Sequence, residues 1–314
     1  MSARFSSCWV VTDGKAGMES QCVGLAEALG LEPRIFRIAL REPWRSFAPH
    51  LRMGLGKALV GNPLAPPWPD LVIATGRQSV PASLLLRQRS PRTKRVQIQN
   101  PAISPRNFDL VIAPIHDDLW GTNVIHTIGA LHRATPERLA SEAAAFAPKI
   151  AGLPHPRIGV LIGGASGAYS FGADHARALA KELVQQATAL GGSLLVTPSR
   201  RTGAENITVL REAISGVPGF FWDGAGDNPY FGILGSADVL LVTADSVNMI
   251  TEACASGRPV YVYELSGGTE KSARFLEGLY LRGYARPYRG SLEPLPTNRL
   301  YEMIRVARAV EAIP

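Results

Sequence analysis

Three short stretches in the second half of the chain carry residues suited to binding a diphosphate. They are Gly163-Gly164-Ala165-Ser166, Arg200-Arg201 and Thr243-Ala244-Asp245-Ser246, and each closely follows an apolar run typical of a buried strand. Backbone N–H groups near a helix start and arginine side chains both bind phosphate oxygens. Ligands of open α/β sheets bind beyond the carboxyl ends of strands, so we predict a phosphate site centred on the third stretch. The alternatives are a flexible turn and a pair of solvated arginines.

Glu252 adds a carboxylate to the third stretch. The sequence predicts a helix that is capped by Asp245 or Ser246 and closed by Gly257. Met249 lies near the first turn of this helix, and Glu252 lies nearly two turns into it. A carboxylate in that position can accept hydrogen bonds from the two hydroxyls of a ribose, as acidic residues do in dinucleotide sites. The alternative is a helical glutamate that faces solvent.

Two turns in the first half occupy the same topological position. Asp13-Gly14-Lys15-Ala16-Gly17 follows a predicted strand at 8–12, and Gly76-Arg77 follows another at 71–75. A strand, a glycine-containing turn and a helix N-terminus together form a candidate cradle for an anion. The spacing is neither a Walker loop nor the GxGxxG fingerprint. A tight turn that needs the backbone freedom of glycine is therefore an equal alternative.

A strand-and-helix rhythm through the whole chain positions these turns. Strands are predicted at 8–12, 34–38, 71–75, 94–99, 110–113, 123–128, 157–162, 193–197, 219–222, 239–242 and 260–263. Helices are predicted at 20–29, 45–59, 135–150, 173–190, 269–283 and 298–311, and others end near 87, 214, 236 and 256. A Pro- and Gly-rich connector predicts a boundary near 153. We therefore expect an α/β, GT-B-like fold with two Rossmann-like domains, 1–153 and 154–314, facing across a cleft.

Composition narrows the class of protein further. The 314 residues, 46% apolar and 19% charged, are typical of a soluble globular protein of two domains. No apolar run approaches the ~20 residues that span a bilayer, and residues 1–12 lack the apolar core of a signal peptide, which predicts a cytoplasmic protein. Cys8, Cys22 and Cys254 have neither zinc nor disulfide spacing, so each is expected to fill a small buried space.

The charge of the chain bears on its partners. The net charge is +7 and the isoelectric point is near 9.5, but the basic residues are scattered, so nucleic-acid binding is not expected. A solvated basic face is one interpretation, and peripheral attraction to anionic headgroups on the inner face of a membrane is the functional one. The segment 42–68, rich in proline and aromatic residues, has the composition of a surface excursion with its own apolar patch. It is a candidate membrane or acceptor contact.

Three segments together resemble a known family. They are Asp13-Gly14-Lys15-Ala16-Gly17 with Gln21, Asn228-Pro229-Tyr230, and the run from Thr243 to Ala253. They resemble the mitochondrial-fission ELM family, whose bacterial members look like GT-B glycosyltransferases, and the likeness covers nearly the whole chain. The turn and helix after Thr243 also look similar to the donor site of the lipid-linked GlcNAc transferase of peptidoglycan synthesis. In that enzyme a glutamate five residues before a glycine holds the donor ribose, and Glu252 and Gly257 reproduce this spacing.

The resemblance implies a transferase that needs neither a metal nor a cofactor and uses a nucleotide-sugar as its substrate. The C-terminal domain would bind the donor, with candidates Gly163, Gly164, Ser166, Arg200, Arg201, Tyr230, Thr243, Asp245, Ser246, Met249 and Glu252. The N-terminal domain would bind an unidentified, membrane-associated acceptor, with candidates Gly14, Gly17, Gly76 and Arg77. Asp13 is the candidate general base, and Lys15 would bind phosphate or an anionic acceptor.

Other assignments remain open from the sequence. His116, His126 and His132 follow or lie in strands of the N-terminal half and are alternative bases. Asp13 is equally suited to shaping its loop or capping the helix after it. Two other functions compete with transfer: a non-catalytic adaptor of the same fold that recruits a partner at a membrane, and a nucleotide-sugar epimerase.

Overall fold

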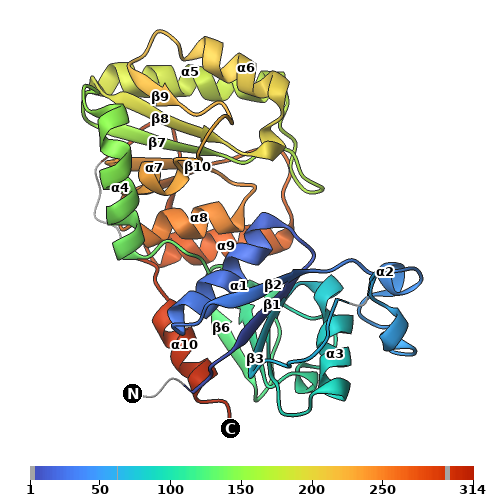
Figure 1. The fold of residues 1–314 in the computed structure, drawn as a ribbon. Helices are drawn as coiled ribbons and strands as arrows, with labels where there is room; N and C mark the ends of the chain where they lie inside the picture. Colours follow the sequence, from blue (N-terminus) through green and yellow to red (C-terminus); the bar gives the residue numbers. More distant parts are fainter. Residues whose placement is uncertain (1–3, 62, 294–297) are drawn as a thin grey trace. The chain divides into compact units, whose positions relative to one another are not determined.

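Each half of the chain builds a six-stranded sheet in which every strand pair is parallel (Figure 1). The computed structural model describes residues 4–61, 63–293 and 298–314. These residues form two units, one of 4–133 with 301–314 and the other of 134–300. The predicted α/β class with two Rossmann-like sheets is therefore confirmed.

The first unit has the strand order β2-β1-β3-β4-β5-β6. Its strands are β1 (Cys8–Thr12), β2 (Pro33–Arg37), β3 (Leu71–Thr75), β4 (Lys94–Ile98), β5 (Leu110–Pro114) and β6 (Val124–Thr127). Its α-helices are α1 (Ala16–Ala28), α2 (Trp44–Phe47), α3 (Val80–Arg89) and α10 (Met303–Glu311). The strand order changes direction at β1, because β2 lies on one side of β1 and β3 to β6 follow on the other. The carboxyl ends of β1 and β3 therefore form the switch point where ligands of such sheets bind.

The second unit has the order β12-β11-β10-β7-β8-β9, which is the order of a dinucleotide-binding sheet. Its strands are β7 (Arg157–Ile162), β8 (Ser193–Pro198), β9 (Gly219–Phe221), β10 (Val239–Thr243), β11 (Val260–Tyr263) and β12 (Arg286–Pro287). Its α-helices are α4 (Pro136–Ile150), α5 (Ala173–Leu190), α6 (Ala204–Ala213), α7 (Tyr230–Ser236), α8 (Val247–Ala255) and α9 (Glu270–Leu281). Here the switch point lies between β7 and β10.

Burial explains why the strands could be predicted from the sequence. Every residue of β1, β3, β5, β8 and β10 is buried, because helices cover both faces of a parallel sheet and select continuous apolar runs. In the first unit, Leu25 of α1 and Val306 of α10 share one apolar cluster, and Leu85 of α3 belongs to the cluster on the other face of the sheet. No helix among the described residues is long and apolar enough to cross a bilayer.

The helix predicted at 45–59 is wrong. The chain forms only α2 and a 3-10 turn at Leu55–Lys57. Pro49 has no N–H to donate to a helical hydrogen bond, and Gly54 takes a left-handed backbone with φ of 63°. These two residues divide the segment into short pieces that are held by side chains, including the indole N–H of Trp44, which donates to the carbonyl of Met53 at 2.8 Å.

Two helices belong to a different unit from the one that a division at residue 153 predicts. Helix α4 packs on α7 in the second unit, and α10 belongs to the first unit. The α4–α7 contact depends on two glycines of α7. A Cβ on Gly232 would lie 2.7 Å from the Cβ of Phe146, and one on Gly235 would lie 2.4 Å from the carbonyl oxygen of Leu139. The absence of these side chains lets the two helices approach closely.

Candidate functional site

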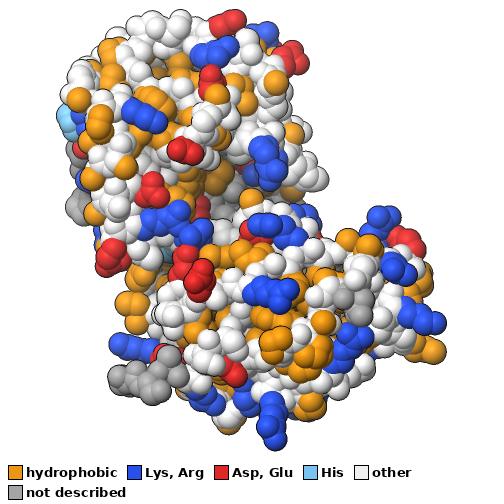
Figure 2. Space-filling model, viewed as in Figure 1, with side chains coloured by type: hydrophobic (Ala, Val, Ile, Leu, Met, Phe, Trp, Pro, Cys, Tyr) orange, Lys and Arg blue, Asp and Glu red, His pale blue; other side chains and the backbone are white. Residues whose placement is uncertain are grey.

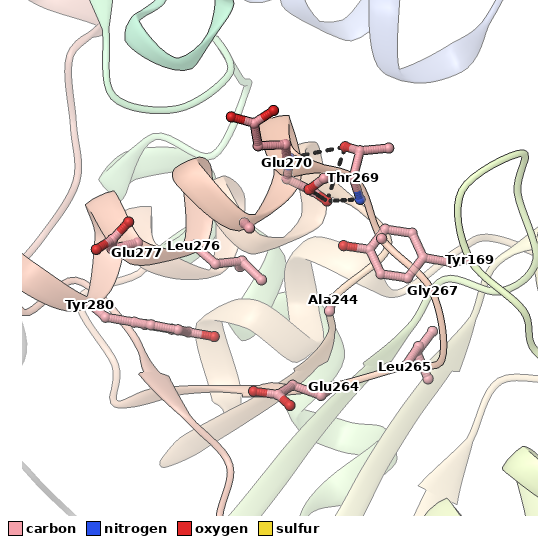
Figure 3. A pocket seen from close by; sticks show the side chains of 13 residues that line it. Tyr169, Ala244, Glu264, Leu265, Gly267, Thr269, Glu270, Leu276, Glu277 and Tyr280 are labelled. Atoms are coloured by element: carbon pink, nitrogen blue, oxygen red, sulfur yellow. Dashed lines mark hydrogen bonds between the residues drawn. The ribbon is translucent and has the colours of Figure 1, made fainter.

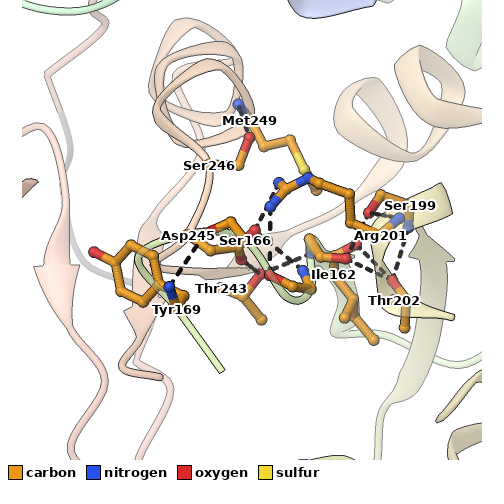
Figure 4. Close-up of polar contacts among 12 residues, drawn as sticks. Ile162, Ser166, Tyr169, Ser199, Arg201, Thr202, Thr243, Asp245, Ser246 and Met249 are labelled. Carbon is orange, nitrogen blue, oxygen red and sulfur yellow. Dashed lines mark hydrogen bonds and ion pairs between the residues drawn. The ribbon is translucent and has the colours of Figure 1, made fainter. Parts of the chain in front are cut away.

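The predicted donor residues gather at the switch point of the second unit. Gly163 directly follows β7, and the turn from Ala244 to Ser246 directly follows β10. The neighbouring strand β8 leads into a 3-10 turn at Arg200–Thr202. Because the carboxyl ends of neighbouring parallel strands meet at one edge of the sheet, three stretches that are far apart in the sequence come together (Figure 4).

Asp245 ties these three strand ends together. Its side chain is fully buried, and its carboxylate accepts the hydroxyl hydrogen of Thr243 at 2.6 Å and the N–H of Gly164 at 3.0 Å. Arg201, which is 40% exposed, pairs with it at 2.6 Å, as Figure 4 shows. A buried carboxylate is costly unless a cation and hydrogen-bond donors of this kind surround it. Asp245 therefore anchors the loops, whereas Ser246 caps α8 by accepting the N–H of Met249 at 3.4 Å.

The two glycines after β7 are required by the space around Asp245. A Cβ on Gly163 would lie 2.0 Å from a carboxylate oxygen of Asp245, and a Cβ on Gly164 would lie 2.2 Å from the carbonyl oxygen of Arg201. The N–H of Gly163 donates to the hydroxyl of Thr243 at 2.8 Å. Both glycine N–H groups are therefore used inside the unit, and the phosphate role predicted for them stays a prediction.

Ser199 and Thr202 complete this network and were not predicted from the sequence. Both hydroxyls donate to the carbonyl of Gly163, at 2.5 and 2.6 Å, and they cap each other's backbone in the 3-10 turn. Their signal was present as a Ser-x-x-Thr pattern directly after a strand, which is typical of a capped turn. Arg200, between them, is exposed, and Ser166 is exposed in the glycine-rich loop.

Glu252 is buried, so the alternative of a solvent-facing glutamate is wrong. Only 8% of the residue is exposed, and its carboxylate accepts the phenol hydrogen of Tyr230 at 2.6 Å. Burial raises the pKa of Glu252 to about 7, while the hydrogen bond from Tyr230 and the charge of Arg138 act in the opposite direction. Burial and the Glu252 carboxylate raise the pKa of Tyr230, so its phenol stays a donor. Two residues predicted separately for nucleotide binding thus form one pair.

A pocket of about 530 Å³ opens beyond the carboxyl ends of β10 and β11 (Figure 3). Helix α9 forms one wall. The other wall is the glycine-rich loop after β7, where Tyr169 forms a β-bridge with Gly267. Ala244 lines the pocket and directly follows Thr243, so the pocket adjoins the turn at which α8 begins.

The predicted acceptor-side residues lie at the switch point of the first unit. Asp13 and Lys15 follow β1 and form an ion pair of 2.6 Å, with the lysine side chain 69% exposed. Gly14 takes a left-handed φ of 83° and its N–H donates to Thr12. Gly76 and Arg77 follow β3, and Arg77 is exposed. Gly17 lies in the first turn of α1 and not in a loop.

The alternative bases and the cysteines are mostly interior residues. His116 and His132 are buried, and the ring of His126 contacts the carbonyl of Leu119 at 2.8 Å. All three cysteines are buried, as predicted, and burial raises the pKa of Cys22 well above its ordinary value. A buried thiol with a raised pKa is a poor nucleophile.

The two six-stranded parallel sheets, each with a switch point in its strand order, define a protein of the GT-B fold, as predicted. The family model of Mitochondrial fission ELM1 matches residues 16–313. The chain belongs to this family. It is 35% identical over 247 residues to Mitochondrial fission protein ELM1 of Arabidopsis thaliana, a match that covers 71% of this chain and spans 58% of the length of the plant protein.

Solved structures share the fold at low sequence identity. The UDP-GlcNAc 2-epimerase of Methanocaldococcus jannaschii, in complex with UDP-GlcNAc and UDP, has a TM-score of 0.56 at 10% identity, covering 98% of this chain and 99% of that one. MurG of Acinetobacter baumannii has a TM-score of 0.50 at 15% identity, covering 96% and 94%. At these identities the likeness shows the fold alone.

Proposed function

We propose that the chain is a glycosyltransferase that takes a sugar from a nucleotide-sugar bound by the second unit and uses no metal. The observation that carries the proposal is the spatial order of three features: Glu252 in α8, the start of α8, and the pocket beside that start. Glu252 lies about 9 Å along the helix from Ser246, the helix start lies next, and the 530 Å³ pocket adjoins it. A ribose, a diphosphate and a sugar follow one another in the same order in a nucleotide-sugar.

The ribose would bind through the Glu252 and Tyr230 pair. An ionised carboxylate accepts hydrogen bonds from two vicinal hydroxyls, and the buried Tyr230 phenol fixes the carboxylate's orientation. The solved epimerase that shares this fold was obtained with UDP-GlcNAc and UDP, which supports a nucleotide-sugar as the ligand class.

The diphosphate would bind at the start of α8. The positive end of the helix dipole and the exposed Arg200 supply charge there, while Arg201 balances the buried carboxylate of Asp245. Ser166 and Met249 would line the same place. In the reaction, the bond from the sugar carbon to the diphosphate oxygen breaks, and the leaving nucleoside diphosphate takes the electron pair.

The acceptor would bind to the first unit at Gly14, Gly17, Gly76 and Arg77. Asp13 would take the proton from the acceptor hydroxyl as its oxygen bonds to the sugar carbon. Lys15, which is paired with Asp13 at 2.6 Å, would hold the anionic part of the acceptor and release the carboxylate for that role.

One surface of the first unit favours the proposal that the acceptor lies in a membrane. We call residues 41–60 the α2 segment. It exposes Phe47 (62%), Met53 (81%) and Val60 (50%), and its exposed cations are Arg41, Arg45, Arg52 and Lys57. Glu42 is its one acidic residue and is paired with Arg45. Figure 2 shows apolar and basic side chains beside one another over α2. Such a mixture suits an interface with anionic headgroups.

Nucleotide binding is tested by thermal shift with UDP, ADP, GDP and CMP. We expect one of them to raise the melting temperature of the wild-type chain. Glu252→Ala should weaken that nucleotide's binding by about 10- to 100-fold, because hydrogen bonds to a charged group contribute about 1.5–3 kcal/mol. Glu212→Ala, on the exposed face of α6, is the matched control and should bind as the wild type does.

The outcome separates the rival functions. The absence of a shift with all four nucleotides would contradict the proposal and favour the adaptor. If a nucleotide-sugar binds and an epimer or free sugar is released without an acceptor, the chain is an epimerase. Transfer to a lipid extract with release of the nucleoside diphosphate would support the transferase.

A further inference from the structure

Arg138 lies in the first turn of α4, where a cation is unfavourable. Its backbone N–H donates to the hydroxyl of Thr135, which caps the helix, at 3.2 Å. The start of a helix carries partial positive charge and stabilises acidic side chains such as Glu137, which lies in the same turn. Glu142, one turn further along, offsets part of this cost, but it is 42% exposed and lies 3.6 Å from the guanidinium. The local preferences of a helix therefore do not explain a cation at this position.

The side chain of Arg138 reaches α7, on which α4 packs (Figure 1). Its guanidinium lies over the ring of Phe231, 4.0 Å from the ring centroid. The electrons of an aromatic face attract a cation at this distance and hold it there. The ring of Phe231 contacts that of Tyr230 edge to face, with centroids 5.2 Å apart. The guanidinium is therefore fixed one aromatic ring away from the residue that donates to Glu252.

Glu252 is the group on which this cation acts. It is buried in α8, and the sequence of that helix contains no other charged side chain. Burial raises the pKa of Glu252, whereas the hydrogen bond from Tyr230 and the positive charge of Arg138 lower it. Tyr230 stays neutral, because burial and the Glu252 carboxylate raise its own pKa. Of the groups that shift the pKa of Glu252, Arg138 is thus the one that supplies positive charge.

We propose that Arg138 is a positioning residue of the nucleotide site, and that its charge holds Glu252 in the ionised form that accepts the ribose hydroxyls. This inference rests on the proposed function, because it assigns the ribose to Glu252. An ionised carboxylate only accepts hydrogen bonds, whereas a protonated carboxyl carries a donor and has less acceptor capacity. Without the cation, the neutral form of Glu252 would predominate at neutral pH and the ribose would bind less tightly.

Calorimetric titration of the full chain with UDP, from about pH 6 to about pH 9, tests the role of this charge. Arg138→Met keeps an unbranched side chain but removes the cation, which should raise the pKa of Glu252 by about one unit. We therefore expect the variant to bind UDP about fivefold less tightly than the wild type at about pH 7 and nearly equally at about pH 9. The ratio of the two affinities cancels the titration of UDP itself. Arg138→Lys should restore binding, and Arg177→Met, which removes an exposed cation of α5, is the matched control and should follow the wild type at every pH.

An NMR titration of isotope-labelled glutamate carboxyls separates this inference from the proposed function, because it needs no nucleotide. Glu252→Gln identifies the signal of Glu252 by removing it. A midpoint about one pH unit higher in Arg138→Met than in the wild type supports the inference. An unchanged midpoint, or a loss of UDP affinity that is equal at every pH, would overturn it and leave nucleotide binding intact. A raised midpoint in a chain that binds no nucleotide would instead overturn the proposed function, and with it the role of Arg138 in binding.

Discussion

At the scale of single residues, Glu252 is subject to opposing influences. Burial favours its neutral form and raises its pKa to about 7, whereas the phenol of Tyr230 and the charge of Arg138 favour the carboxylate. Ribose hydroxyls bind more strongly to the ionised form. The pKa of Glu252 therefore lies close to neutral pH, where both its neutral and its ionised form are populated.

Stability should reveal this raised pKa. The pKa of Glu252 is higher in the folded chain than its ordinary value of 4.5, so its contribution is fully present below about pH 4.5 and is lost as pH rises through about 7. That difference corresponds to about 3 kcal/mol as an upper estimate. In urea unfolding, Glu252→Gln should gain stability relative to the wild type between about pH 5 and pH 8. A difference that does not change with pH would contradict the raised pKa.

The sequence could predict the position of Glu252 but not its partner. Its spacing to Gly257 depends on one helix, and local patterns describe a helix well. The bond to Tyr230 joins α7 to α8, and no local pattern contains that contact. Asp245 illustrates the same limit. Its neighbours suggested a helix cap or a phosphate contact, but the network with Arg201 and Gly164 forms only when three strand ends meet.

At the scale of elements, the buried strands were the most predictable part. A parallel strand covered on both faces is a continuous apolar run, and β1, β3 and β7 have the predicted bounds. The short strand β12 was missed because two residues carry too little pattern. The backbone of the α2 segment was predicted wrongly, as one helix, because its path depends on prolines, glycines and single side-chain hydrogen bonds.

The α2 segment should carry the membrane contact. We expect Phe47→Glu with Met53→Glu to reduce binding to vesicles of phosphatidylcholine with phosphatidylglycerol by at least about tenfold, because each apolar side chain contributes about 1.5–3 kcal/mol when buried. Sedimentation with vesicles measures the bound fraction. Leu281→Glu with Ile304→Glu is a matched control, since both residues are exposed apolar side chains elsewhere, at 78% and 54%.

Two outcomes would argue against this assignment. Equal losses in the two double variants would mean that binding depends on general apolar exposure and not on the α2 segment. Equal binding of the wild type to vesicles of pure phosphatidylcholine would remove the role of Arg41, Arg45, Arg52 and Lys57, which are expected to make binding sensitive to salt.

At the scale of the whole molecule, the chain leaves its first unit and returns to it. Helix α4 packs on α7, although it precedes the connector that predicted the boundary. Helix α10 comes after the second sheet and supplies Met303, Val306 and Val310 to the core of the first unit. A connector rich in proline and glycine marks a break in secondary structure, but only tertiary packing decides to which unit the flanking helices belong.

This arrangement predicts that a single change near the C-terminus damages the first unit. Val306 is fully buried in the cluster that includes Leu25, so Val306→Asp should destabilise that unit by at least about 3 kcal/mol. Ile304→Asp, on the exposed side of α10, should change stability by about 0.5 kcal/mol or less. Hydrogen exchange with mass spectrometry should show protection lost in residues 4–133 and kept in 134–300, with nucleotide binding retained. Loss of protection in both ranges would mean that the two units unfold as one.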